Sequence, residues 1–259
     1  MKKIFKIFGL CAIMLFSFYY TEKIALYARK QSPLMMEIKA AKDNLTVSSI
    51  NAEVMNDYII PGINGLEVNV EKSFFNMKSF NAFNSYYLVF DQVFPDISLE
   101  NNKNKIIKKG NYRKRSVSFI VEPTDAIINF FKNNKIEVSI LVNLNDYNKY
   151  KNYELLNYEV TDFKKLNTLL DKIEQNTKIC IVNSNIKEEC IKNNYYLVEN
   201  NKELNGTNIA ILKSEIESGD IILIKNNINL EDLRILINQI KYQNLNIIKL
   251  SDLITEENN

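Results

Sequence analysis

The sequence predicts an α/β domain built on a parallel sheet, open or closed into a barrel, behind a small extended module and an apolar N-terminal helix. From residue 115 onward, short apolar runs alternate with amphipathic helical patterns at the spacing of βα units. The run at 221–224 has four aliphatic residues in succession, which is typical of a strand buried on both faces. In such folds the residue after the strand, here Lys225, lies at the functional edge.

The composition excludes several classes of function. The 259 residues are 46% hydrophobic, enough for one sizeable core or one core plus a small module. The net charge is +2 and neither sign forms a long block, so nothing favours binding to nucleic acid. The chain has no histidine, which excludes a histidine general base, Ser-His-Asp or Cys-His catalysis, and imidazole metal ligands.

The N-terminus has the pattern of a signal sequence or membrane anchor. An apolar run at 7–20 follows three lysines, and no small-x-small cleavage site comes soon after it, because Ala25 and Ala28 have the wrong spacing. We expect an uncleaved single-pass anchor over 1–30, with the main domain extracytoplasmic; the alternative is secretion after signal cleavage. The three lysines are Lys2, Lys3 and Lys6, and Tyr19 and Tyr20 fit an interfacial position.

The sequence between the anchor and the α/β region has two parts. Residues 31–50 are polar with scattered alanines and fit a stalk. Residues 51–112 contain short extended runs broken by turn signals, among them Asn64-Gly65, a dipeptide that favours a hairpin turn. We therefore expect a small, mostly β module at 51–112 and the α/β domain at 113–259.

Within 113–259 the elements alternate. Thr124, Thr161 and Asn229 lie at N-cap positions of expected helices. The helices are expected at 124–134, 161–175, 186–194 and 229–243, and the strands at 116–121, 137–142, 178–182, 195–199, 208–212, 219–225 and 246–250, before a terminal turn at 251–254.

Two of the three cysteines lie in this region. Cys180 is in the strand-like 178–182 and Cys190 in the helix-like 186–194, whereas Cys11 is in the apolar N-terminal run. A disulfide between Cys180 and Cys190 is compatible with a location outside the cell. Free buried cysteine is also a common core residue, so both readings stay open.

Three stretches resemble the polysaccharide deacetylase (NodB-homology) family. The end, "GDIILIK" followed by a helix, a hydrophobic strand and "LSDLI", is similar to the family's "GDIILLH", helix, strand and "LSEL". The start, "VSFIVEPTDAIINFFKNNKIEVSILVN" at 117–143, resembles "VALTFDDGP … LLDILKKHGVKATFFV", and "YELLNYEVTD" at 153–162 falls where the family has "HEIGNHTYSH". The resemblance covers about 115–255 and implies a distorted (β/α) barrel.

The family's chemistry depends on residues that this chain replaces. The family holds a divalent metal with an Asp-His-His set, uses an adjacent Asp as general base and protonates the leaving amine with a late histidine. The resemblance places Glu122 at the base and Pro123 at the metal-binding Asp. The two histidine ligands fall on Tyr158 and Asp162, and the late histidine falls on Lys225. The family's arginine-bearing stretch is reduced to "CIVNSN" at 180–185, and the chain has no tryptophan.

These replacements predict a degenerate, membrane-anchored relative without metal or other cofactor, which uses the barrel to bind cell-wall glycan or an envelope protein. Each candidate ligand-binding residue also has a plain structural interpretation, such as a solvated strand end, a helix start or half-buried packing. The candidates are Glu122, Asp125, Tyr158, Asp162 and Lys225.

Two other hypotheses stay open. The chain is alternatively a divergent carbohydrate hydrolase or deacetylase that uses carboxylates, namely Glu122, Asp125 and Asp162, in place of the Asp-His-His site. A third reading makes 51–112 the working part of a cell-surface protein, with the degenerate barrel as its scaffold.

Overall fold

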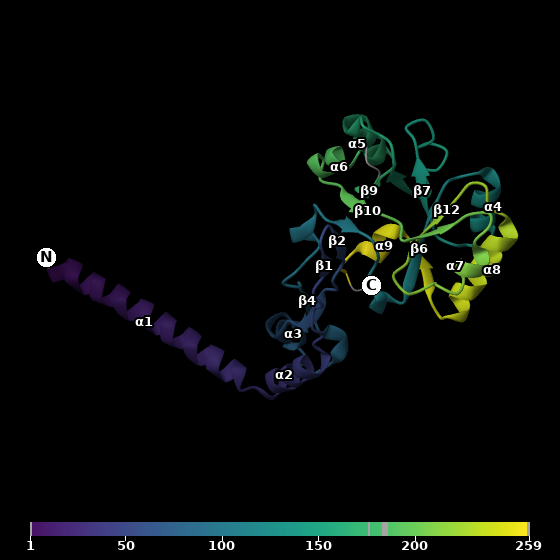
Figure 1. Cartoon of the computed structure of the whole chain (residues 1–259). Helices are drawn as coiled ribbons and strands as arrows, with labels where there is room; N and C mark the ends of the chain where they lie inside the picture. Colours follow the sequence, from purple (N-terminus) through teal and green to yellow (C-terminus); the bar gives the residue numbers. More distant parts are fainter. Residues whose placement is uncertain (1, 176, 183–185, 258–259) are drawn as a thin grey trace. The chain divides into compact units, whose positions relative to one another are not determined.

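The computed structural model describes residues 2–175, 177–182 and 186–257 (Figure 1). Contacts divide the chain into two compact units. Unit 1 comprises Met1–Ser48 and Gly65–Val93, and unit 2 comprises Ser49–Asn64 and Phe94–Asn259. The ranges expected from the sequence (1–30, 31–50, 51–112 and 113–259) stay a prediction about separate domains.

Unit 1 packs two helices against a two-stranded antiparallel sheet. Ser32 begins α2 by accepting a hydrogen bond from the Met35 amide at 3.2 Å. Strands β3 and β4 pair antiparallel, and a small apolar core joins α2, α3 and β3. The elements are α1 (Lys2–Lys30), α2 (Pro33–Leu45), β3 (Gly65–Val68), α3 (Val70–Met77), the 3₁₀ turn η1 (Ser85–Tyr87) and β4 (Phe90–Val93).

Helix α1 is long and apolar enough to cross a membrane. The candidate span, Gly9–Lys30, has 22 residues and a mean hydropathy of 1.2. A signal sequence has the same properties, so the helix by itself is compatible with either role.

Unit 2 contains an 11-stranded sheet that curls into a half-barrel. Among the described residues every strand pair in it is parallel except β1–β2, because the remaining connections cross over through helices or loops. The strands, in order across the sheet, are β1 (Glu53–Met55), β2 (Tyr58–Ile60), β5 (Ile106–Ile107), β10 (Tyr196–Val198), β9 (Ile179–Ile181), β8 (Glu154–Asn157), β7 (Ser139–Val142), β6 (Ser116–Val121), β12 (Ile221–Ile224) and β11 (Lys202–Leu204), with β13 (Asn246–Ile248) also paired to β6.

The predicted α/β fold of the distorted-barrel type is therefore confirmed. Helices follow the strands as the amphipathic patterns predict, and Thr124 and Asn229 cap α4 and α8. The cap of α5 is Asp162 rather than Thr161. The helices of unit 2 are α4 (Asp125–Asn133), α5 (Phe163–Lys172), α6 (Lys187–Lys192), α7 (Ile209–Leu212), α8 (Leu230–Tyr242) and α9 (Leu250–Ile254), with 3₁₀ turns η2 (Glu100–Asn102) and η3 (Tyr112–Lys114).

The two faces of the sheet bury different partners. Side chains alternate along β6, so that Val117, Phe119 and Val121 join the outer core, where α4, α5 and α8 pack. Ile120 joins the inner core, which α9 fills from inside the curl with Leu250, Leu253 and Ile254 (Figure 1). The inside of the half-barrel is thus packed with aliphatic side chains rather than open.

Helix α9 is fixed at both ends by charged side chains. At its start, the buried Glu154 carboxylate accepts a hydrogen bond from the Leu250 amide at 3.0 Å. At its end, the Lys114 ammonium donates to the Asp252 and Thr255 carbonyls at 2.7 and 2.6 Å. Burial lowers the pKa of Lys114 to about 8, although nearby Asp252 opposes this shift.

Two local predictions are wrong. Residues 208–212 were expected as a strand, but α7 forms there and β11 pairs with β12 instead, because Ile211 is exposed and only Leu212 of the helix is buried. The hairpin turn was expected at Asn64-Gly65, but the β1–β2 hairpin turns at 56–57, where Asn56 has a φ of 51°.

Candidate functional site

The carboxyl edge of the sheet brings Glu122 and Lys225 together. Glu122 follows β6 and Lys225 follows β12, two strands that pair in parallel. Ile120 and Leu223 belong to the inner core, so alternation by two residues places Glu122 and Lys225 on the inner side. The Lys225 Nζ donates to Glu122 Oε1 at 2.7 Å, with 35% of the lysine side chain and 25% of the glutamate side chain exposed.

The backbone holds the glutamate in place. The Glu122 amide donates to the Ile224 carbonyl at 3.0 Å, which continues the β6–β12 pairing past the strand end. The second carboxylate oxygen, Oε2, accepts from the Asn226 amide at 3.2 Å. Both oxygens of Glu122 are therefore engaged by the segment that follows β12.

Tyr158 completes this edge from β8. Asn157 at the end of β8 is 2% exposed, and its amide group donates to the Val160 carbonyl at 3.1 Å and accepts from the Val160 amide at 2.9 Å. This closed pair fixes the turn that presents Tyr158, whose side chain is 37% exposed. Sequence reasoning named Tyr158 but not Asn157, although an asparagine directly after a buried apolar run was a usable signal.

Lys225 stays protonated at neutral pH. The hydrogen bond to Glu122 raises the pKa of Lys225 and burial opposes this shift, while the negative charges of Glu122 and Glu203 favour the ammonium form. Glu203, in β11, was not predicted from the sequence, because the strand that carries it was not expected there.

The other two predicted carboxylates have separate structural roles. Asp125 is exposed and pairs with Lys149 at 2.9 Å. Asp162 Oδ1 accepts from the Lys165 amide at 3.0 Å as the N-cap of α5. Pro123 lies between Glu122 and the cap residue Thr124 and has no side-chain ligand atom.

The described part of the chain, 2–175, 177–182 and 186–257, has no cluster of three or more Cys, Asp or Glu side chains arranged to hold a metal ion. Hard divalent cations need several oxygen ligands converging on one point, and zinc sites in proteins use cysteine, histidine or carboxylate sets. Chemically, the edge therefore offers an ammonium, a carboxylate and a phenol, which together can hydrogen-bond a polar ligand.

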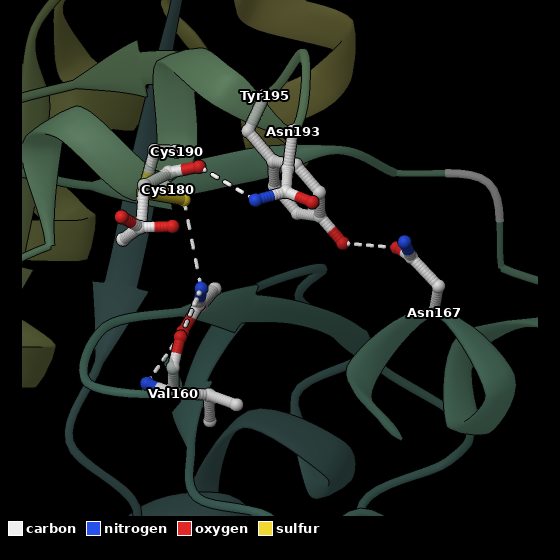
Figure 2. Close-up of a disulfide and its surroundings, with 8 residues drawn as sticks. Val160, Asn167, Cys180, Cys190, Asn193 and Tyr195 are labelled. Carbon is white, nitrogen blue, oxygen red and sulfur yellow. Dashed lines mark hydrogen bonds between the residues drawn. A yellow bond between two sulfur atoms is a disulfide. The ribbon is translucent and has the colours of Figure 1, made fainter. Parts of the chain in front are cut away.

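Cys180 and Cys190 form a disulfide, which settles the two readings left open by the sequence (Figure 2). Their Cα atoms are 6.3 Å apart, and both side chains are fully buried between β9 and α6. The bridge spans residues 183–185, part of the "CIVNSN" stretch, and these three residues lie outside the described part of the chain.

The side chains around the disulfide are tightly paired. The Asn157 amide lies 3.5 Å from the Cys180 sulfur, so the disulfide contacts the residue that positions Tyr158. Figure 2 also shows the Tyr195 hydroxyl pointing at Asn167, to which it donates at 2.6 Å. These contacts join β8 to β9 through Asn157 and Cys180, and α5 to the residue before β10 through Asn167 and Tyr195.

The curled half-barrel has the fold of the CE4 family of polysaccharide deacetylases. The solved structure of a CE4 family pseudoenzyme from Bacillus anthracis superposes with a TM-score of 0.59 at 17% identity, over 88% of this chain and 97% of that chain. A mutant of that pseudoenzyme, with restored enzymatic activity, superposes equally well (TM-score 0.59) at 18% identity, over 87% of this chain and 99% of that chain.

Sequence comparison gives a shorter match. An uncharacterized protein of Bacillus subtilis (strain 168), YlxY, is 36% identical over 92 residues, which are 35% of this chain and 29% of that protein. The match thus spans less than a third of the relative's length. No protein-family model matches the chain.

Proposed function

We propose that this chain is a degenerate CE4-type protein that keeps the barrel, lacks the family's metal-dependent deacetylation and binds cell-envelope glycan or an envelope protein at the extracytoplasmic face. The Glu122–Lys225 ion pair carries this proposal. It occupies the two positions at which the resemblance puts the general base and the late histidine.

The pair is poorly suited to acid–base catalysis. A general base must be free to accept a proton, and its pKa is best matched to the working pH. Glu122 instead accepts from Lys225 and from the Asn226 amide, and the raised pKa of Lys225 keeps its proton bound. The ion pair between Glu122 and Lys225 therefore favours ligand binding over proton transfer at the carboxyl edge of the sheet.

The location is proposed on two features. Helix α1 is of a length to anchor the chain in a membrane, and it is not followed by a cleavage pattern. The Cys180–Cys190 disulfide is typical of a compartment outside the reducing cytoplasm. Together they support a single-pass protein with its barrel on the extracytoplasmic side.

The contacts give the carboxylate-based alternative less support. A glycosidase-like mechanism needs two carboxylates across one bond, separated by roughly 5 to 9.5 Å according to mechanism. Here Glu122, Asp125 and Asp162 are each engaged by a different partner: Lys225, Lys149 and the Lys165 amide. Unchanged glycan turnover in a Glu122→Gln/Asp162→Asn double variant would remove the basis for this alternative.

Ligand binding is tested on the full chain in detergent, with purified peptidoglycan as the probe. We expect saturable co-sedimentation that falls by roughly threefold or more in Lys225→Gln and in Tyr158→Ala, because each removes one polar or aromatic contact. Lys192→Gln removes a lysine that pairs with Glu189 on α6, away from the candidate residues, and should bind normally. If all three variants bound peptidoglycan as strongly as the natural chain, the glycan proposal would be contradicted, and an envelope protein would be the partner to seek.

The family frame itself can be tested by restoring its ligands. The quadruple variant Pro123→Asp, Tyr158→His, Asp162→His and Lys225→His should bind about one zinc ion per chain, because the resemblance places these positions around one metal. The natural chain is the control. A folded quadruple variant with no zinc affinity would show that these four positions do not surround one metal site as they do in the family.

A further inference from the structure

Unit 1 carries a set of exposed aromatic side chains beside the end of α1. Exposed aromatic surface is costly in water, so a contiguous set requires an explanation. We name this set the aromatic rim; its members and their exposed fractions are Phe75 (53%), Phe80 (55%), Tyr86 (86%) and Tyr87 (37%).

Three rings of the aromatic rim are neighbours, and the fourth, Phe75, lies against the end of α1. The rings of Phe80 and Tyr87 lie 5.2 Å apart, and those of Tyr86 and Tyr87 lie 5.5 Å apart. The Asn76 side chain, next to Phe75, donates to the Tyr87 carbonyl at 3.4 Å. The Arg29 guanidinium, in the last turn of α1, lies 4.9 Å from the Phe75 ring centroid.

The connection between α1 and unit 1 is short. Only Gln31 and Ser32 separate α1 from α2, and Ser32 already caps α2. Two residues reach at most about 7 Å. Because α2 shares an apolar core with α3, which carries Phe75, the aromatic rim stays close to the end of α1.

The candidate span ends at this same point. Gly9–Lys30 has 22 residues, about 33 Å of helix, which matches the roughly 30 Å hydrocarbon core. Glu22 and Lys23 interrupt the apolar run, but Ile24, Leu26 and Tyr27 are again exposed, and they continue the apolar surface to Arg29. A span that ends at Lys30 puts Tyr27, rather than the expected Tyr19 and Tyr20, at the interface.

We infer that the aromatic rim lies in the interfacial layer of the membrane, so that unit 1 rests on the bilayer instead of standing away from it. Tyrosine and phenylalanine side chains next to basic residues suit the headgroup region, where rings are partly buried and polar tips stay wet. The occupant is a lipid surface, because the rim continues the surface of the helix that enters it. This inference rests on the membrane anchoring proposed above.

The absence of tryptophan from the chain allows a direct depth measurement. The full chain is reconstituted into phosphatidylcholine–phosphatidylglycerol vesicles as two single-tryptophan variants, Tyr86→Trp in the rim and Tyr242→Trp on α8. Tyr242 is the reference because its side chain is equally exposed, at 83% against 86%, and belongs to unit 2. Both substitutions replace one exposed aromatic ring by another, so neither should prevent folding.

We expect the rim tryptophan to emit at shorter wavelength than the reference. Lipids brominated near the headgroup should quench it by about half, while aqueous iodide quenches mainly the reference. A rim tryptophan that iodide quenches as strongly as the reference, and bromolipid does not, would overturn the inference. A blue shift without bromolipid quenching would also overturn it and would indicate a protein partner or a second copy.

Flotation of the same vesicles separates the two proposals. If the protein floats with the vesicles but its rim tryptophan is exposed to water, the anchor stands and the rim inference fails. If the protein does not float, the anchoring proposal fails, and the inference falls with it.

Discussion

Lys225 and Glu122 form an ion pair at the carboxyl edge of the sheet, and this pair contributes little to the free energy of unfolding. Both side chains are partly exposed, so water and salt screen the attraction. In the proposed function, the pair matters because it sets which charges the carboxyl edge of the sheet presents to a ligand.

Replacing this lysine should change stability only slightly. We expect Lys225→Gln to lower the free energy of unfolding by about 0.5 kcal/mol at pH 7, measured by urea denaturation. Because the folded pKa of Lys225 is raised, the contribution is complete below the unfolded value of about 10.4 and is lost as the pH rises through the folded value. A loss of several kcal/mol would mean that the pair is a buried structural element, contrary to its exposure.

The sequence predicted which residues lie at the carboxyl edge of the sheet but not which residues they contact. Glu122 and Lys225 follow apolar runs, so strand periodicity alone placed them at the carboxyl edge. That Asp125 pairs with Lys149, and that Asn157 binds Val160, depends on how loops fold over the sheet. Such contacts are set by tertiary packing, which no local pattern contains.

At the scale of elements, α9 joins the C-terminal segment to the sheet. Lys114 donates two hydrogen bonds to the end of α9, yet it is buried enough for its pKa to fall to about 8. The unfolded chain, in which a lysine has a pKa of about 10.4, therefore binds more protons than the folded chain between these values.

Stability should consequently rise with pH in this window. We expect the Lys114 contribution to increase the free energy of unfolding by roughly 1–2 kcal/mol between pH 7.5 and 9.5. Urea unfolding of the natural chain and of Lys114→Met, at several pH values without reductant, checks this. If the two proteins had the same pH slope, the shifted pKa of Lys114 would be refuted.

The disulfide joins β9 to α6 and closes a loop with a sequence separation of 10 residues. By loop-closure entropy such a bridge stabilises the fold by about 3 kcal/mol. Reduction should therefore lower the urea midpoint of the natural chain, while the Cys180→Ala/Cys190→Ala variant should be insensitive to reductant. A natural chain that is equally stable with and without reductant would contradict a structural role for the bridge.

The elements differ in how well the sequence predicted them. Runs such as 116–121 and 229–243 match β6 and α8 within a few residues, because their periodicity is long and consistent. The segment 208–212 is too short for periodicity to distinguish a strand from a helix, and it folds as α7. The disulfide stayed undecided because two cysteine positions do not define a distance.

At the scale of the whole molecule, the CE4 fold is present in a chain that has no histidine at the carboxyl edge of the sheet or anywhere else. The inner core and α9 maintain the half-barrel by apolar packing, independently of any residue at the carboxyl edge. The frame therefore does not depend on the side chains at the carboxyl edge, which is what the proposed loss of the family's chemistry requires.

The most direct test of this account measures zinc and acetate together on the purified full chain. After incubation with zinc and removal of excess metal, we predict roughly 0.1 zinc ions or fewer per chain and no acetate release from N-acetyl chitooligosaccharide or peptidoglycan. About one zinc ion per chain, with acetate release that a chelator abolishes, would contradict it.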